Sequence, residues 1–355
     1  AISKEMKQLH WRNSYVPRHY HTLTKKQKEQ LLESHIFVEE KRDGTIKARK
    51  VIDGNKQRDY ITKEDVSSPT VTAEAVMLTC VIDAQENRDV AVVDIPNAFI
   101  QTVVSEEDAE HRVTVRIRGP LVDILVSMAP DVYGSYVSVT KTGQKVLIVE
   151  CLNAVYGTMV AALLYYKKFV KSLKNQGFKL NPYDGCVANK IIKGKQITIC
   201  FHVDDCKISH EVPEVIDETI VWLKAEYESI FEDGSGEMKV HRGRVHKYLG
   251  MSLDFTNKGQ CIVTMNDYVA EIVKAYDLAR AKHDDGFLPV TKQRYETPAP
   301  ENLFTVNEDC EKLPEDMAAD LHTVVAKTLY VTKRARPDTC LSVAFLTTRV
   351  RAPDR

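Results

Sequence analysis

The stretch Ile197-Thr198-Ile199-Cys200-Phe201-His202-Val203-Asp204-Asp205-Cys206-Lys207-Ile208-Ser209 sets two adjacent carboxylates in an apolar, β-branched run. Such residues on both sides of a short polar break are typical of a β-hairpin, so we expect Asp204 and Asp205 at the tip of one. Two neighbouring carboxylates repel each other unless a cation lies between them, which makes the tip a candidate metal site. A solvated acidic turn is the simpler interpretation, because aspartate is a common turn residue.

A third carboxylate, Asp94, favours the metal site. It follows the apolar residues 90–93 as a residue at the end of a buried strand does, and Pro96 ends the strand because proline has no backbone N–H. Carboxylate oxygens are ligands that Mg²⁺ prefers, and two such ions can hold the attacking and leaving oxygens of a phosphoryl transfer. We therefore expect two Mg²⁺ ions, or Mn²⁺ in their place, at Asp94, Asp204 and Asp205.

Four segments, in this order, resemble motifs of the reverse transcriptases of Ty1/copia-type LTR retrotransposons, the polymerase region of the Pol polyprotein. They are Asp94-Ile95-Pro96-Asn97-Ala98-Phe99 (first catalytic motif), Leu152-Asn153-Ala154-Val155-Tyr156-Gly157 (Leu-x-Lys-Ala-Leu-Tyr-Gly), Phe201-His202-Val203-Asp204-Asp205 (Tyr-x-Asp-Asp) and Lys247-Tyr248-Leu249-Gly250-Met251 (Tyr-Leu-Gly). The resemblance covers residues 35–255 well and the rest more loosely.

This resemblance implies an α+β fold of the right-hand polymerase type, with fingers, an antiparallel palm sheet and a helical thumb. Residues 1–34 would then be an N-terminal lead-in, to which we assign no chemistry, and residues 35–255 would form the fingers and palm. Residues 256–355 would form the thumb and a connection toward an RNase H domain, whose carboxylates we do not find before Arg355.

The resemblance also implies roles for single residues. Asp94, Asp204 and Asp205 would be catalytic and bind metal; Lys47, Arg49, Phe99, Tyr156 and Gly157 would contact the nucleotide; and Tyr248, Leu249 and Gly250 would form the primer grip. Lys47 and Arg49 alternate onto one face of a strand in a predicted hairpin over residues 36–54, where they would neutralise a triphosphate. An edge strand kept soluble by its charges is the alternative for this pair. A core aromatic is the alternative for Phe99, which in the family blocks the ribose 2′-hydroxyl.

The function that these features imply is RNA-directed DNA polymerisation, with dNTPs, a primer, and an RNA or DNA template as partners. Met159 and Val160 stand where the family has lysine and glutamine, and His202 replaces the usual tyrosine. These departures keep open a second hypothesis, a truncated or decayed element product that binds nucleic acid without polymerising. A metal-dependent nuclease is a third, against which the fingers and primer-grip resemblance argues.

The charge and cysteine patterns limit what can be inferred about nucleic-acid binding, the state of the thiols and zinc. The 49 Lys and Arg residues nearly balance 50 Asp and Glu, so net charge gives no nucleic-acid signal. The basic segments 41–58, 165–179 and 239–247 fit either a basic groove or ordinary solvated faces. The eight cysteines never occur at Cys-x-x-Cys spacing, which indicates reduced thiols and no zinc site.

No apolar run reaches the roughly 18 residues that span a bilayer, so we expect no membrane partner. We expect an intracellular protein, in a cytoplasmic virus-like particle with entry into the nucleus. The other parts of a Gag-Pol polyprotein would be its neighbours.

Overall fold

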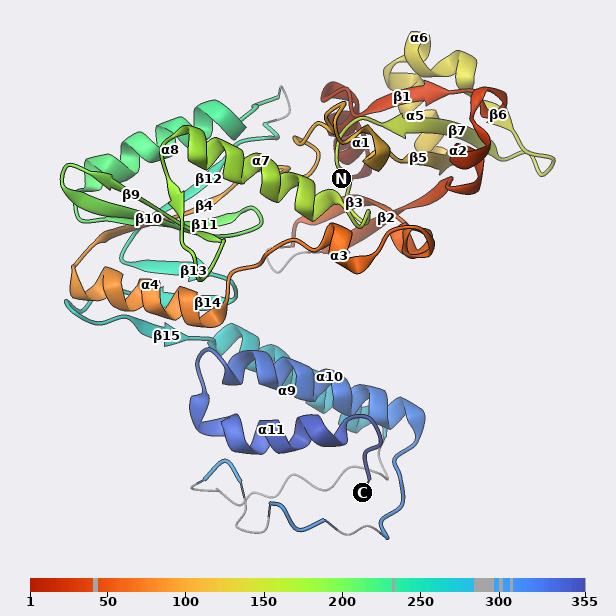
Figure 1. Cartoon of the computed structure of the whole chain (residues 1–355). Helices are drawn as coiled ribbons and strands as arrows, with labels where there is room; N and C mark the ends of the chain where they lie inside the picture. Colours follow the sequence, from red (N-terminus) through yellow and green to blue (C-terminus); the bar gives the residue numbers. More distant parts are fainter. Residues whose placement is uncertain (41–43, 232–233, 284–296, 300–302, 307–308, 355) are drawn as a thin grey trace. The chain divides into compact units, whose positions relative to one another are not determined.

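The computed structural model describes residues 1–40, 44–231, 234–283, 297–299, 303–306 and 309–354. The chain packs into two compact units: unit 1 contains residues 1–71 and 91–241, and unit 2 contains residues 72–90 and 242–355. Both units combine helices with strands, so the protein is of the α+β class, as predicted (Figure 1). The predicted division at residues 34 and 255 concerns polymerase subdomains and stays a prediction.

One sheet of unit 1 has the strand order β1-β7-β5-β2-β3, and β6 pairs with β7. Its strands are β1 (Tyr15–Arg18), β2 (Leu32–Glu40), β3 (Ile46–Ile52), β5 (Thr114–Arg118), β6 (Ser138–Val139) and β7 (Lys145–Cys151). The predicted hairpin over residues 36–54 is the antiparallel pair β2 and β3. Part of its predicted turn falls on residues 41–43, which lie outside the described residues.

Helices α1 (Ile2–Trp11) and α5 (Pro120–Met128) cover this sheet. Met6 and Leu9 of α1 and Val122 and Leu125 of α5 enter one apolar core with the buried side chains of the strands. Three more short helices belong to unit 1: α2 (Lys25–Glu29), α3 (Lys63–Val66) and α6 (Pro130–Tyr133). The sequence did not predict α1, whose position becomes important at the functional site.

The other sheet of unit 1 has the order β12-β4-β11-β10-β9-β8. Its strands are β4 (Asp89–Asp94), β8 (Lys179–Leu180), β9 (Val187–Ile192), β10 (Lys195–His202), β11 (Asp205–His210) and β12 (Lys239–Gly243). Helices α7 (Ala161–Asn175) and α8 (Pro213–Tyr227) pack on it through aromatic rings (Figure 1). The Phe169 ring lies 4.9 Å from that of Phe201 in β10 and 5.8 Å from that of Tyr227 in α8.

The predicted faces of these two helices had different outcomes. The spacing of Ile216, Ile220, Leu223 and Tyr227 predicts one apolar face for α8, and all four residues are buried. For α7, the spacing of Leu163, Tyr166, Val170 and Leu173 predicts one apolar face and an end near Asn175. The end is confirmed, and Val170 and Leu173 are buried as predicted. Leu163 and Tyr166 are only partly buried, whereas Leu164, Tyr165 and Phe169 are buried. Apolar residues occur on more than one side of α7, so spacing alone did not fix the buried side.

Unit 2 contains the strands β13 (Val245–Tyr248), β14 (Met251–Asp254) and β15 (Ile262–Thr264), which pair in that order. Its helices are α4 (Ala73–Gln85), α9 (Asn266–Lys282), α10 (Glu315–Thr332) and α11 (Cys340–Arg349). The 4, 3, 4 spacing of Val71, Ala75, Leu78 and Ile82 predicts an apolar packing stripe for α4. The stripe is wrong at its centre, because Leu78 is 61% exposed, whereas Val76 and Cys80 are buried. Within the described residues, no helix is both long and apolar enough to cross a membrane.

The cysteines are free thiols, and most of them are buried. Burial raises the pKa of Cys151 to about 12. Burial, followed by repulsion from Asp205 and Asp204, raises the pKa of Cys206 well above its usual value. Cys340, in contrast, is exposed.

Candidate active site

A pocket of about 300 Å³ in unit 1 brings together residues that lie far apart in the sequence. Its wall includes two acids from the predicted metal site, Asp94 and Asp204, and the two predicted phosphate-binding residues, Lys47 and Arg49. The pocket therefore joins acidic and basic side chains from β3, the end of β4 and the turn between β10 and β11.

The β-hairpin predicted from the sequence is present, with its tip one residue earlier than expected. His202 of β10 pairs with Asp205 of β11, so the connecting residues are Val203 and Asp204. The backbone N–H of Ile95 donates to the carbonyl oxygen of Asp204 at 3.0 Å. Since β4 also lies beside β11 in the sheet, this hydrogen bond holds Asp94 and Asp204 at the same edge.

The carboxylates interact unfavourably with one another. Burial, and then repulsion from Asp94, raises the pKa of Asp204. Burial raises the pKa of Asp205 to about 6, with further contributions from Asp204 and Asp94. Both side chains are partly buried, which does not fit a freely solvated acidic turn. The group carries negative charge that a bound cation would neutralise.

Lys47 and Arg49 lie on one face of β3, as predicted. Both are exposed, whereas the intervening Ala48 and the following Lys50 are buried on the opposite face. Lys47 and Arg49 lower the pKa of Asp204 electrostatically, although burial outweighs them. The basic pair therefore lies close enough to the carboxylates to act on the same ligand.

Tyr156 lines the pocket and is held by β3. Its carbonyl oxygen accepts a hydrogen bond from the N–H of Ile52 at 2.8 Å, and its ring lies 5.5 Å from the Arg49 guanidinium. Burial, and then repulsion from Asp204, raises the pKa of Tyr156 to about 12, so the hydroxyl remains a donor at neutral pH.

The backbone conformation and the close neighbours at position 157 leave room only for glycine. Its φ is +90°, and an added Cβ would collide with the Ile52 carbonyl and lie 2.6 Å from Cγ1 of Val51. Gly157 lines a neighbouring pocket of about 340 Å³ with His35 and Phe37, rather than the pocket that holds Asp94 and Asp204. Its nucleotide contact stays a prediction.

Phe99 packs behind Tyr156. It joins a small apolar cluster with Val160 and Met159, and its ring lies 4.8 Å from that of Tyr156. Phe99 is absent from the lining of the carboxylate pocket. This packing favours the core-aromatic interpretation of Phe99, and its role in selecting the sugar stays a prediction.

The predicted primer-grip residues lie in unit 2, at the turn between β13 and β14. Tyr248 pairs with Met251, which leaves Leu249 and Gly250 as the turn residues, with φ values of 48° and 77°. The hydroxyl of Tyr330 in α10 donates to the carbonyl oxygen of Leu249 at 2.8 Å and supports this turn. A primer grip of this family is a hairpin, and β13 and β14 form one here. The contact with a primer stays a prediction.

The donor chemistry of the carboxylates fits Mg²⁺. Within the described residues, no three or more His, Cys, Asp or Glu side chains are arranged as a complete metal site. Mg²⁺ does not require one, because it is commonly bound by one or two carboxylates together with water and substrate phosphates. Asp94 and Asp204 line one pocket and supply such a partial shell.

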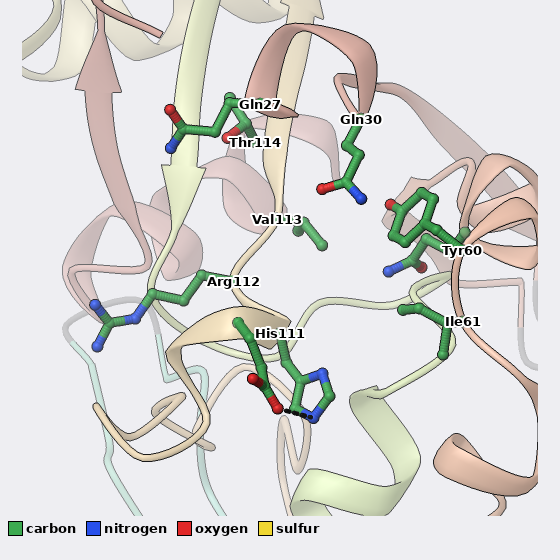
Figure 2. Close-up of a pocket in the computed structure, with 10 residues that line it drawn as sticks. Gln27, Gln30, Tyr60, Ile61, His111, Arg112, Val113 and Thr114 are labelled. Carbon is green, nitrogen blue, oxygen red and sulfur yellow. Dashed lines mark ion pairs between the residues drawn. The ribbon is translucent and has the colours of Figure 1, made fainter. Parts of the chain in front are cut away.

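A second polar pocket of unit 1 is too small for a nucleotide. It has a volume of about 40 Å³. Gln30, Tyr60, His111 and Arg112 are among the residues that line it (Figure 2). His111 Nε2 lies 3.9 Å from a carboxylate oxygen of Glu110. A water molecule takes about 30 Å³ in the liquid, so this pocket suits solvent rather than a substrate.

The sequence did not predict one wall of the pocket that holds Asp94 and Asp204. Lys4, Glu5 and Gln8 of α1 line it, as does Lys239 of β12. Glu5 accepts a hydrogen bond from the backbone N–H of Lys50 at 3.0 Å, which fixes α1 against β3. The alternation of Met6 and Leu9 with polar residues was the available signal for a helix, but no local pattern connects residue 5 with residue 50.

Comparison with known proteins finds retrotransposon polyproteins. The chain is 25% identical over 272 residues to the truncated transposon Ty1-A Gag-Pol polyprotein of Saccharomyces cerevisiae, which covers 73% of this chain and 20% of the polyprotein. It is 22% identical over 204 residues to a putative transposon Ty5-1 protein of the same yeast, covering 58% of this chain and 59% of that protein. No family model matches the sequence.

Among solved structures, telomerase from Candida albicans with a fragment of telomeric RNA has a TM-score of 0.36 and 12% identity, covering 98% of this chain and 63% of that one. Apo telomerase from Candida tropicalis has a TM-score of 0.42 and 9% identity, covering 98% and 60%.

The chain spans a fifth or less of the Ty1 polyproteins that it matches. The predicted resemblance to Ty1-type retrotransposon proteins is thus supported over most of this chain, while the assignment to their reverse transcriptase region stays a prediction.

Proposed function

We propose that the protein is an RNA-directed DNA polymerase of a copia-type retrotransposon, which transfers deoxynucleotides to a primer 3′-hydroxyl. The observation that carries this proposal is the single pocket in which Asp94 and Asp204 lie with Lys47 and Arg49. Nucleotidyl transfer needs both kinds of side chain, because carboxylates bind divalent ions while cationic groups neutralise the triphosphate.

In this mechanism the protein acts mainly by positioning and by neutralising charge. Asp94, Asp204 and Asp205 would hold two Mg²⁺ ions, which when bound stabilise charge on the attacking and leaving oxygens. Arg49 can bind phosphate oxygens bidentately, and Lys47 adds a point charge. Tyr156, fixed on β3, donates a hydrogen bond from its hydroxyl or packs against the nucleotide.

The remaining roles follow the family resemblance. Phe99 would act on sugar selection through Tyr156, against which it packs, and Gly157 would lie near the nucleotide. The turn with Tyr248, Leu249 and Gly250 would seat the primer end. We place the reaction inside the cell, in a virus-like particle with other parts of a Gag-Pol polyprotein, on an RNA or DNA template.

The test is extension of a DNA primer on an RNA template by the purified protein, with Mg²⁺ or Mn²⁺ and all four dNTPs. We expect the wild-type protein to extend the primer and Asp204→Asn to lose at least about 100-fold in rate, because an amide cannot replace a metal-binding carboxylate. Binding of the primer–template should change little. Asp131→Asn, at an exposed acid of α6 outside the pocket, is the matched control. Near wild-type extension by Asp204→Asn would refute the metal assignment.

A second candidate function is nucleic-acid binding without polymerisation. Val160 is buried and Met159 packs in the same apolar cluster, so neither position offers a polar group to a nucleotide. Absence of extension with Mg²⁺ and with Mn²⁺, together with duplex binding that weakens as salt rises, would favour this function over the polymerase.

A further inference from the structure

Gln8 is a buried polar residue in the wall of the pocket. Its side chain is 7% exposed, and its amide oxygen Oε1 has no hydrogen-bond partner within the described residues. Buried polar atoms in proteins nearly always have a partner, and an exception calls for an explanation. Because Gln8 lines the pocket that holds Asp94 and Asp204, a ligand in that pocket can supply the missing partner.

Helix α1, which carries Gln8, is held in place by core packing and by a hydrogen bond to β3. Gln8 lies three residues after Glu5 and four after Lys4, so the three side chains share one face of α1, and all three line the pocket. Met6 and Leu9 of the same helix are buried in the core. The hydrogen bond from Lys50 N–H to Glu5 attaches α1 to the strand that carries Lys47 and Arg49.

We propose that Gln8 is a further nucleotide-binding residue, which accepts a hydrogen bond from the nucleoside part of a bound deoxynucleoside triphosphate. This inference rests on the proposed function and adds the α1 wall to it. An amide oxygen is an acceptor, so its partner must be a donor. A phosphate at neutral pH offers few donors, whereas the sugar hydroxyl and the base N–H groups are donors.

The experiment measures the affinity for dATP at equilibrium. The full chain is bound to an RNA template whose DNA primer ends in a dideoxynucleotide, with Mg²⁺, so that the nucleotide binds without reacting. We expect Gln8→Leu to weaken dATP binding about three- to tenfold, the factor that corresponds to one neutral hydrogen bond. Gln30→Leu makes the same change in the small pocket of Figure 2 and should leave the affinity unchanged.

Thermal unfolding separates this role from a structural one. If Gln8 serves only the fold, Gln8→Leu should lower the melting temperature, and any loss of dATP affinity should accompany that loss of stability. A weaker affinity at an unchanged or higher melting temperature supports the proposal, and Gln8→Met provides a second variant of similar shape. Weaker binding that accompanies a lower melting temperature in both variants would overturn it.

The choice of nucleotide identifies the donor. An equal loss with dATP and dTTP supports a contact with the sugar hydroxyl, whereas a loss confined to dATP supports a contact with the base amino group. If wild-type protein binds no dNTP, the proposed function fails and this inference with it. If the wild type binds dATP and Lys47→Ala weakens it but Gln8→Leu does not, this inference alone is overturned.

Discussion

Gly157 shows how one residue fixes the position of its neighbour at the site. Replacement by alanine should destabilise the protein by about 3 kcal/mol or more, because the new Cβ would collide with the Ile52 carbonyl and crowd Val51 at a φ that L-residues avoid. Urea unfolding measures the change. Gly194→Ala is the control, since its φ is also positive (+75°) but no atom lies within 4 Å of the added Cβ. A cost of only about 1 kcal/mol, as expected for Gly194, would show that β3 and the loop of Tyr156 separate easily.

Lys50 couples stability to pH. Its side chain is buried, its Nζ has no hydrogen-bond partner within the described residues, and burial lowers its pKa to about 8. Below pH 8 the folded state carries the whole cost of the buried charge. Between pH 8 and 10.5 the folded state releases the proton while the unfolded chain keeps it, so stability from this group rises with pH.

We therefore expect Lys50→Met to raise the free energy of unfolding at pH 7 by an amount on the order of 3 kcal/mol, with a gain that shrinks toward zero near pH 10.5. Urea titrations at several pH values measure this. Lys47→Met, on the exposed face of the same strand, should show no such trend. A gain in unfolding free energy that stays constant with pH would show that burial does not lower the pKa of Lys50.

At the scale of the element, the turn between β10 and β11 stores backbone strain. Val203 has a φ of 55°, which is unfavourable for a β-branched residue, and strain of this kind often occurs at functional sites. Val203→Gly should stabilise the fold by about 0.5–1 kcal/mol and reduce primer extension about tenfold, because a looser turn holds Asp204 less precisely.

The control for this change is Lys193→Gly, at the turn between β9 and β10, where φ is 50°. It should give a similar gain in stability with no loss of extension. Thermal unfolding and the extension assay measure both variants. Equal activities for the two would show that the strain at Val203 has no part in the function.

The same elements show how far the sequence predicts the fold and the site. The β10–β11 hairpin and α8 were predicted because their apolar patterns are local and unambiguous. The tip of the hairpin was misplaced by one residue, since the register depends on the pairing of His202 with Asp205. The stripe of α4 was wrong because apolar residues occur around that helix, and only tertiary packing determines that Leu78 is exposed.

The residues of the candidate site were predictable where the family resemblance marks them, and not where distant polar residues close the pocket. Asp94, Asp204, Lys47 and Arg49 were predicted, and the structure places them in one pocket. The contribution of α1 was missed, because Glu5 acquires its role only from a hydrogen bond to residue 50. No spacing rule contains such a contact.

At the scale of the whole molecule, two segments that are far apart in the sequence form unit 2. Residues 72–90 belong to the same compact unit as residues 242–355. The side chain of Gln85 at the end of α4 donates to the carbonyl oxygen of Gly259 at 3.4 Å. A fragment that ends at residue 241 therefore keeps α4 but loses the rest of its unit.

We expect the fragment 1–241 to aggregate or to bind a hydrophobic dye, because α4 loses the rest of the compact unit in which Val76 and Cys80 are buried. Uncovering a buried side chain such as that of Val76 costs roughly 1.5–3 kcal/mol. Light scattering and dye fluorescence, compared with the full chain, measure this. A second fragment that ends at residue 283 retains β13 to β15 and α9 and should be less prone to aggregate. A cooperative fragment 1–241 with the melting temperature of the full chain would contradict the division into these two units.

The difference among the cysteines gives the molecule a natural attachment point for a dye. A maleimide reacts with the thiolate, so Cys151 and Cys206, buried and held protonated, should remain unlabelled in the folded protein. Cys340 at the start of α11 is exposed and should take up the fluorophore first. With Cys261 and Cys310 replaced, because both are partly exposed, polarised emission from that dye would follow the tumbling of unit 2 as a primer–template binds.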